Sequence, residues 1–262
     1  GLAAGGMALP SGWLGQADNF LGIDEPWCHP DQAGVYVLPA PYEHTSSYIL
    51  GSDRGPSAII EASQQVELYD ETLRYEPYRE WGGVATAATL NLDGRVDGPA
   101  VQAIQDFVQP HVGRGKFLVT LTGEHTGALG AIRAHARNYP GMCVVQIDAH
   151  GDLRQAYQDN PYSHASVMAR VVEDGLPLVQ IGVRSISPEE IDLIQKTPRI
   201  HTFFAASILD PSGPYEGRAA RWIPEVLAAC TGPVYLTFDC DGLDASLVPA
   251  LGTPEPGGLG WY

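Results

Sequence analysis

A short apolar run that ends in acidic side chains and an imidazole lies near the middle of this sequence: Val144-Val145-Gln146-Ile147-Asp148-Ala149-His150-Gly151-Asp152. A run of this length, bounded by turn residues, is typical of a buried strand. In an extended backbone, residues two positions apart point to the same side, so Asp148, His150 and Asp152 can converge near one point. The stretch therefore predicts a strand with a polar cluster at its carboxyl end.

Similar apolar runs alternate with helical patterns along the chain. The predicted strands are Gly34–Leu38, Lys116–Leu121, Met142–Ile147, Leu178–Val183 and Val234–Phe238. The predicted helices are Pro56–Arg74, Thr126–Asn138, Ser163–Glu173, Glu189–Gln195 and Ala219–Ala229. Strands separated by helices favour right-handed βαβ crossovers. We therefore expect the α/β class, with three α/β/α layers around a central, mainly parallel sheet.

The length of 262 residues suffices for one large core, and no repeat or long linker divides the sequence. We predict an irregular N-terminal arm over residues 1–33 and one α/β domain over residues 34–262. The stretch Gly257–Tyr262 is typical of a turn that enters another element. We therefore expect that this chain lacks the C-terminal end of its domain.

The composition excludes several kinds of partner. A net charge of −16 without a Lys/Arg cluster argues against nucleic acid and against an anionic membrane, because these surfaces repel an acidic protein. No apolar run reaches the roughly 18 residues that a membrane span requires, and the start lacks the basic region of a secretory signal. The four cysteines share no CxxC spacing. These features predict a cytoplasmic protein.

Two further clusters follow apolar runs. The run Val234–Phe238 leads into Asp239-Cys240-Asp241, and the run Phe117–Leu121 leads into Thr122-Gly123-Glu124-His125. Ligands of open parallel sheets bind beyond the carboxyl ends of the strands. We therefore expect the three clusters to meet at one edge of the sheet.

The three clusters together predict a metal site. Neighbouring carboxylates repel one another, and divalent cations relieve this repulsion. Aspartates and imidazoles without thiolates suit manganese better than structural zinc. For a single cluster, a turn or helix-cap role for the aspartate and a surface role for the histidine are good alternatives. Three clusters at strand ends favour a site for two ions, with these ligands: His125, Asp148, His150, Asp152, Asp239 and Asp241.

The motifs resemble those of a known family. Gly123-Glu124-His125, Asp148–Asp152 and Phe238–Asp244 are similar to the three signatures of arginases and agmatinases, and Gly252–Gly258 resembles the loop that follows them. Upstream, the segment Pro41–Tyr48 resembles the N-terminal part of agmatinase-like members. The resemblance covers roughly residues 34 to 262.

The resemblance implies an arginase-like fold with two Mn²⁺ ions per subunit. Asp148 and Asp239 would bridge the ions, so Asp148 also has a catalytic role. The solvent between the ions would attack the guanidinium carbon, and urea and an amine would leave. A histidine in the position of His164 is implied to carry a proton to the departing amine, although Ala165 stands where the family usually has glycine.

The resemblance also bears on the substrate. Ser187 stands where an arginase would carry an aspartate for the α-amino group, which disfavours arginine. Asp159 and Asn160 are candidate substrate-binding residues, although both can equally be turn residues. The leading hypothesis is agmatine, cleaved to urea and putrescine, a step of polyamine biosynthesis. N1-aminopropylagmatine, guanidinobutyrate and arginine are alternatives, as are an inactive family member and a metal-dependent hydrolase of another substrate. Analogy suggests a homotrimer or homohexamer, and family members carry a guanidinium-binding glutamate beyond the position of Tyr262.

Overall fold

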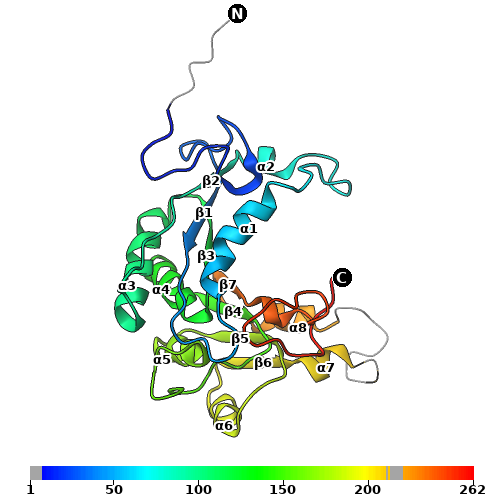
Figure 1. The fold of residues 1–262 in the computed structure, drawn as a ribbon. Helices are drawn as coiled ribbons and strands as arrows, with labels where there is room; N and C mark the ends of the chain where they lie inside the picture. Colours follow the sequence, from blue (N-terminus) through cyan, green and yellow to red (C-terminus); the bar gives the residue numbers. More distant parts are fainter. Residues whose placement is uncertain (1–7, 211, 213–220) are drawn as a thin grey trace, which may run out of the picture.

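The computed structural model describes residues 8–210, 212 and 221–262. The strands are β1 Val35–Ala40, β2 Val84–Thr86, β3 Phe117–Thr122, β4 Cys143–Ile147, β5 Leu178–Val183, β6 Ile200–Phe204 and β7 Val234–Phe238. The helices are α1 Gly55–Ser63, α2 Pro77–Glu80, α3 Asp97–Val108, α4 Ala128–Asn138, α5 Val167–Glu173, α6 Pro188–Lys196, α7 Ala205–Leu209 and α8 Ile223–Ala229 (Figure 1).

The strands pair in parallel, in the orders β2-β1-β3 and β6-β5-β4-β7. This confirms the predicted α/β class. Within the described residues the strands form two hydrogen-bonded sheets, whereas we expected one central sheet. The division falls between β3 and β7, whose outer sides carry exposed apolar residues: Phe117 at 70%, and Val234, Leu236 and Phe238 at 53%, 55% and 48%.

The helices cover both sides of the strands. In Figure 1, α3 and α4 lie on one side of β1 and β3, and α1 lies on the other side. In one core, Leu38 of β1 packs with Ile104 and Val108 of α3. A second core contains Leu129 of α4, Met168 of α5 and Leu178 of β5. These helices fix the strand ends, because the buried apolar faces allow one arrangement of the layers.

Some predicted elements differ from the structure. The helix expected over Pro56–Arg74 ends at Ser63, because the chain then forms turns in which Asp70 Oδ1 accepts from the backbone N–H of Thr72 and Leu73. Helix α8 begins at Ile223, and residues 219 and 220 of the expected helix lie outside the described residues. The sequence patterns did not identify α3, β2 or β6.

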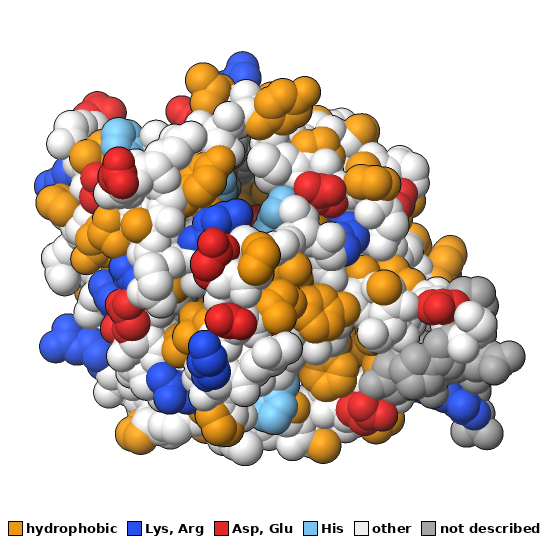
Figure 2. Space-filling view, turned by 90° about the horizontal axis from the view of Figure 1, so that it is seen from below, with side chains coloured by type: hydrophobic (Ala, Val, Ile, Leu, Met, Phe, Trp, Pro, Cys, Tyr) orange, Lys and Arg blue, Asp and Glu red, His pale blue; other side chains and the backbone are white. Residues whose placement is uncertain are grey.

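Positive and negative side chains are mixed on the surface of this acidic chain. On the face in Figure 2, Lys and Arg side chains are scattered among Asp and Glu and form no continuous basic patch. Among residues 8–210, 212 and 221–262, no helix combines the length and apolar character needed to cross a membrane.

Candidate metal centre and adjoining cavities

Three strand ends bring the predicted ligands together. Strands β4 and β7 pair with Ile147 opposite Phe238, so Asp148 and Asp239 follow their strands at the same level. His125 comes from the segment after β3. Its Nδ1 atom lies 2.9 Å from Asp148 Oδ2, 2.8 Å from Asp152 Oδ2 and 3.7 Å from Asp239 Oδ2. We call His125 and these three aspartates the inner group.

A second set of side chains lies beside the inner group and shares Asp148 with it. His150 Nδ1 lies 3.0 Å from Asp241 Oδ2 and 3.5 Å from Asp148 Oδ1. We call His150, Asp148 and Asp241 the outer group, since the His150 side chain is 23% exposed whereas that of His125 is 6% exposed. The spacing of the ligand atoms in His125, Asp148 and Asp239, and again in the outer group, suits one metal ion each.

Two glycines permit this convergence. A Cβ atom on Gly242 would lie 2.7 Å from Ile147 Cγ2 and 2.9 Å from Asp148 N, and one on Gly123 would lie 2.2 Å from Tyr42 O. A side chain at Gly242 would separate the segments that carry Asp148 and Asp241, and one at Gly123 would push the segment that carries His125 away from Tyr42. The glycines of the two motifs therefore have a packing reason.

Polar side chains in the second sheet form hydrogen bonds to two of the proposed ligands. Gln146, Gln180 and Thr202 stand opposite one another on β4, β5 and β6. Thr202 Oγ1 donates to Gln180 Oε1, Gln180 Nε2 donates to Gln146 Oε1, and Gln146 Nε2 donates to Asp148 Oδ2 at 2.9 Å. On β7, Thr237 Oγ1 lies 2.8 Å from His125 Nε2. We call Gln146, Gln180 and Thr202 the polar ladder. The ladder orients Asp148, and Thr237 orients His125.

A second support holds the loop that follows the last ligand strand. The Arg184 guanidinium donates to backbone carbonyls of this loop, including Leu243 and Glu255 at 3.2 and 2.8 Å. The Asp244 carboxylate accepts from the N–H groups of Gly257 and Gly258. The loop thereby places Glu255 Oε1 3.7 Å from His150 Nε2, on the side of the ring away from the other ligands.

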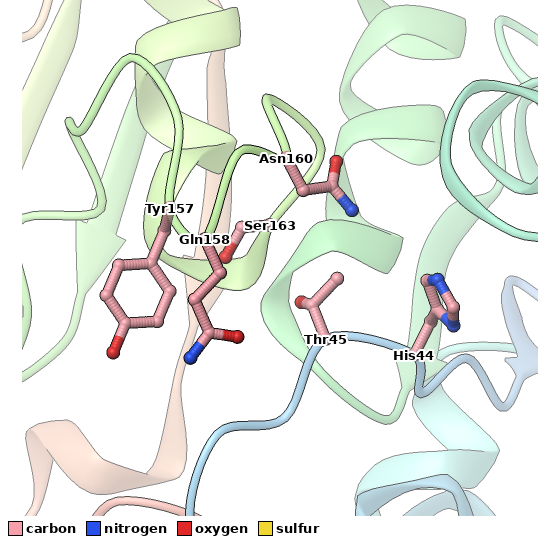
Figure 3. Close-up of a pocket in the computed structure, with 6 residues that line it drawn as sticks. All are labelled: His44, Thr45, Tyr157, Gln158, Asn160 and Ser163. Carbon is pink, nitrogen blue, oxygen red and sulfur yellow. The ribbon is translucent and has the colours of Figure 1, made fainter.

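A cavity of about 250 Å³ opens beside the two groups. His150, Asp152, His164, Ser187 and Tyr157 are among the residues that line it. A second hollow of about 180 Å³ adjoins it, because Tyr157 lines both. Figure 3 shows this hollow between the loop of residues 157–163 and the segment of residues 44 and 45, with the Thr45 side chain rising toward the loop.

Comparison with known proteins identifies the family. The model of the arginase family matches residues 33–262 of this chain. The chain belongs to the arginase family. An N(1)-aminopropylagmatine ureohydrolase from Synechocystis sp. is 43% identical over 98% of this chain and 82% of the relative. An agmatinase from Bacillus anthracis is 30% identical over 88% of this chain and 76% of the relative.

Solved structures agree with the fold. The agmatine ureohydrolase of Thermoplasma volcanium is 30% identical and superposes with a TM-score of 0.70, covering 87% of this chain and 74% of that structure. The arginase-like fold predicted from the sequence is thus confirmed for this arginase-family chain. The family motifs lie at the strand ends described above.

The electrostatics of the site show how strongly the carboxylates compete for positive charge. Burial and the neighbouring Asp148 raise the pKa of Asp152 to about 7, and the same two causes, with Asp241, raise the pKa of Asp239. Burial would lower the pKa of His150, but hydrogen bonds to Asp148 and Asp241 raise it to about 11. Protons therefore neutralise the cluster of this arginase-family chain when no other cation is bound, and a hard donor set of this kind fits divalent metal ions.

Of the remaining predicted site residues, two line a cavity and one does not. His164 lines the same cavity as His150 and Asp152. Asn160 lines the second hollow and donates from Nδ2 to Asp97 Oδ1 at 2.8 Å. Asp159 is exposed and lines neither cavity, with a left-handed φ of 61° that is typical of a turn. Its predicted contact with substrate gains no support from this geometry.

Several residues of the site were not singled out by sequence reasoning: Thr45, Gln146, Gln180, Thr237 and Glu255. Strand alternation could have found Gln146 and Thr237, since each lies two positions before a ligand and faces the same side. Thr45 and Glu255 come from loops that are distant in sequence, and no periodicity predicts their position.

Proposed function

We propose that this arginase-family hydrolase cleaves the guanidinium group of a linear guanidino amine to urea and an amine. One observation carries the proposal. Six side chains of ligand type leave three strand ends and form an inner and an outer group joined by Asp148, and an open cavity with His164 lies beside them. The arrangement combines a cation-binding centre with a titratable group at its mouth.

The residues fit two divalent ions, for which manganese is our proposal. His125, Asp148, Asp152 and Asp239 would hold one ion, and His150, Asp148, Asp239 and Asp241 would hold the other. The four aspartates balance the charge of two such ions, and the donors are oxygen and imidazole nitrogen only. When bound, the ions supply the charge that ionises a water molecule near neutral pH.

The chain's own residues would act on the substrate in two ways. Glu255, which is not needed to balance the ions, provides negative charge 3.7 Å from His150 Nε2, and this charge attracts a guanidinium cation. His164 would carry the proton to the departing amine. Burial lowers the pKa of His164, so the ring is neutral near pH 7 and has a free nitrogen lone pair that can accept and then return a proton.

Within this class, N1-aminopropylagmatine is our first candidate. The Synechocystis relative that carries this activity in its name is 43% identical, and the second hollow continues the cavity past Tyr157. A substrate longer than agmatine would extend into this hollow, where the amide of Gln158 and the carbonyl oxygen of Asn160 can meet an ammonium group. Agmatine is the second candidate, supported by the agmatinase from Bacillus anthracis.

The test is urea release from four substrates: N1-aminopropylagmatine, agmatine, arginine and guanidinobutyrate. The protein is loaded with Mn²⁺, and Asp148→Ala is the control. We expect kcat/KM to be highest for N1-aminopropylagmatine and urea release to disappear in the control. A higher kcat/KM for agmatine would move the assignment to the second candidate. Urea from none of the four substrates by the loaded protein would overturn the proposed function.

A further inference from the structure

The half-buried hydroxyl group of Thr45 connects His164 to the carboxylate of Glu124. Thr45 Oγ1 lies 3.1 Å from His164 Nδ1 and 2.7 Å from Glu124 Oε1. The backbone N–H of His164 also donates to Thr45 Oγ1, at 3.0 Å. Three contacts therefore meet on one hydroxyl group, which has a single hydrogen to donate and two lone pairs to accept with.

The carboxylate at the far end is fixed. Glu124 is 6% exposed, and its Oε2 atom accepts from the backbone N–H groups of His44 and Thr45 at 2.8 and 2.7 Å. Its Oε1 atom receives the Thr45 hydroxyl hydrogen. Because this hydrogen is directed at Glu124, the hydroxyl oxygen can only accept from the imidazole.

The consequence concerns which nitrogen of His164 carries its hydrogen. An accepting hydroxyl requires a hydrogen on Nδ1, so the neutral ring has its lone pair on Nε2. Among the described residues, Nε2 of His164 forms no hydrogen bond. The Tyr157 ring lies edge-on to the imidazole, with the ring centroids 6.1 Å apart.

We propose that Glu124 and Thr45 are positioning residues that hold His164 in its Nδ1–H tautomer and leave Nε2 as the proton-exchanging atom toward the cavity. The inference rests on the proposed proton-transfer role of His164 for its functional meaning, but the tautomer itself does not depend on that role. Thr45 connects the segment typical of agmatinase-like members to the catalytic histidine.

The decisive experiment is a long-range ¹H–¹⁵N spectrum of histidine-labelled protein free of paramagnetic metal, at pH 8, with His164 assigned by the loss of its signals in His164→Gln. The wild type is expected to show a protonated Nδ1 and an unprotonated Nε2. Thr45→Val, which keeps the shape but cannot accept, should shift the ring toward the Nε2–H tautomer. Thr45→Ser should retain the wild-type pattern.

Kinetics provide the second measurement. General acid–base groups contribute roughly 10²–10⁴-fold to rate, so loss of the correct tautomer in Thr45→Val should lower kcat by about 10-fold or more, with KM changed less than about twofold. Thr45→Ser should recover most of kcat, and the exposed Thr72→Val serves as the control for threonine removal.

An Nε2–H tautomer in the wild type would overturn the proposal, even if the valine variant failed to fold. Unchanged kcat in a folded Thr45→Val protein would also overturn it. Failure of the proposed function is distinguishable, because a wild type that releases no urea would still show the Nδ1–H tautomer.

Discussion

The inner and outer groups use the same chemistry in different surroundings. The His125 side chain is 6% exposed, and both ring nitrogens have partners: Asp152 at Nδ1 and Thr237 at Nε2. His150 lies on the cavity wall, and its Nε2 atom faces Glu255 at 3.7 Å. We therefore expect the inner group to contribute more to the stability of the fold than the outer group, whose His150 lies at the cavity. Asp148 belongs to both groups, so it offers the strongest test of the comparison.

Asp148→Ala is expected to have the largest effect. The substitution removes a ligand from both groups and leaves His125 and His150 without a shared partner. We expect loss of both ions and a fall in activity beyond the roughly 10- to 100-fold that outer-shell substitutions cost. Metal content by elemental analysis and urea release check this result. The exposed Asp93→Ala is the matched control, and two retained ions in Asp148→Ala would refute the shared-ligand assignment.

Substitution of each histidine in turn distinguishes the inner group from the outer group. In metal-free protein, His125→Asn should lower the free energy of unfolding more than His150→Asn does, because it leaves buried Asp152 and Thr237 without partners at about 1–3 kcal/mol for each unsatisfied group. Urea denaturation of both variants measures this difference. Equal destabilisation would show that the distinction between an inner and an outer group has no energetic basis.

The polar ladder should give a smaller effect, which reaches the metal centre through Asp148. Gln146→Leu removes the donor to Asp148 Oδ2, and we expect metal affinity to fall roughly 10- to 100-fold, as for other outer-shell partners. Titration with Mn²⁺ checks the affinity. Thr202→Val, at the far end of the ladder, should have a weaker effect, and an equal or larger effect would contradict transmission along the ladder.

Metal binding should reverse the pH dependence of the stability of the fold. In metal-free protein, the pKa of Asp152 is raised from 3.8 to about 7 and that of His150 from 6.5 to about 11, so the folded state holds more protons than the unfolded state. The contribution of Asp152 is therefore lost as pH rises from about 4 to 7, and that of His150 as pH rises from about 6.5 through 11.

Metal ions compete with these same protons, so the stabilisation that Mn²⁺ adds should increase with pH. Thermal unfolding between pH 5 and 9, with and without Mn²⁺, measures both trends. Metal-free protein that becomes more stable as pH rises across this window would contradict the proton-neutralised cluster.

Much of the site could be predicted because the ligands follow strands in sequence. Asp148, His150 and Asp152 are local to one strand end, and the parallel arrangement of β4 and β7 brings Asp239 and Asp241 to the same edge. The predicted length of helix α1 was wrong. The apolar pattern continues beyond Ser63 into turns, one of which is stabilised by a hydrogen bond to the Asp70 side chain. Strand β2 has three residues, which is too short for a periodic pattern.

The sequence alone determined the α/β class, the acidic character of the chain and the set of candidate ligand residues, because strand periodicity and residue chemistry are local properties. Tertiary structure decided which histidine is more deeply buried and how Thr45 reaches His164 across 119 positions of sequence. These features depend on packing between distant segments, where a displacement of one hydrogen-bond length changes the partner, and no local pattern encodes such distances.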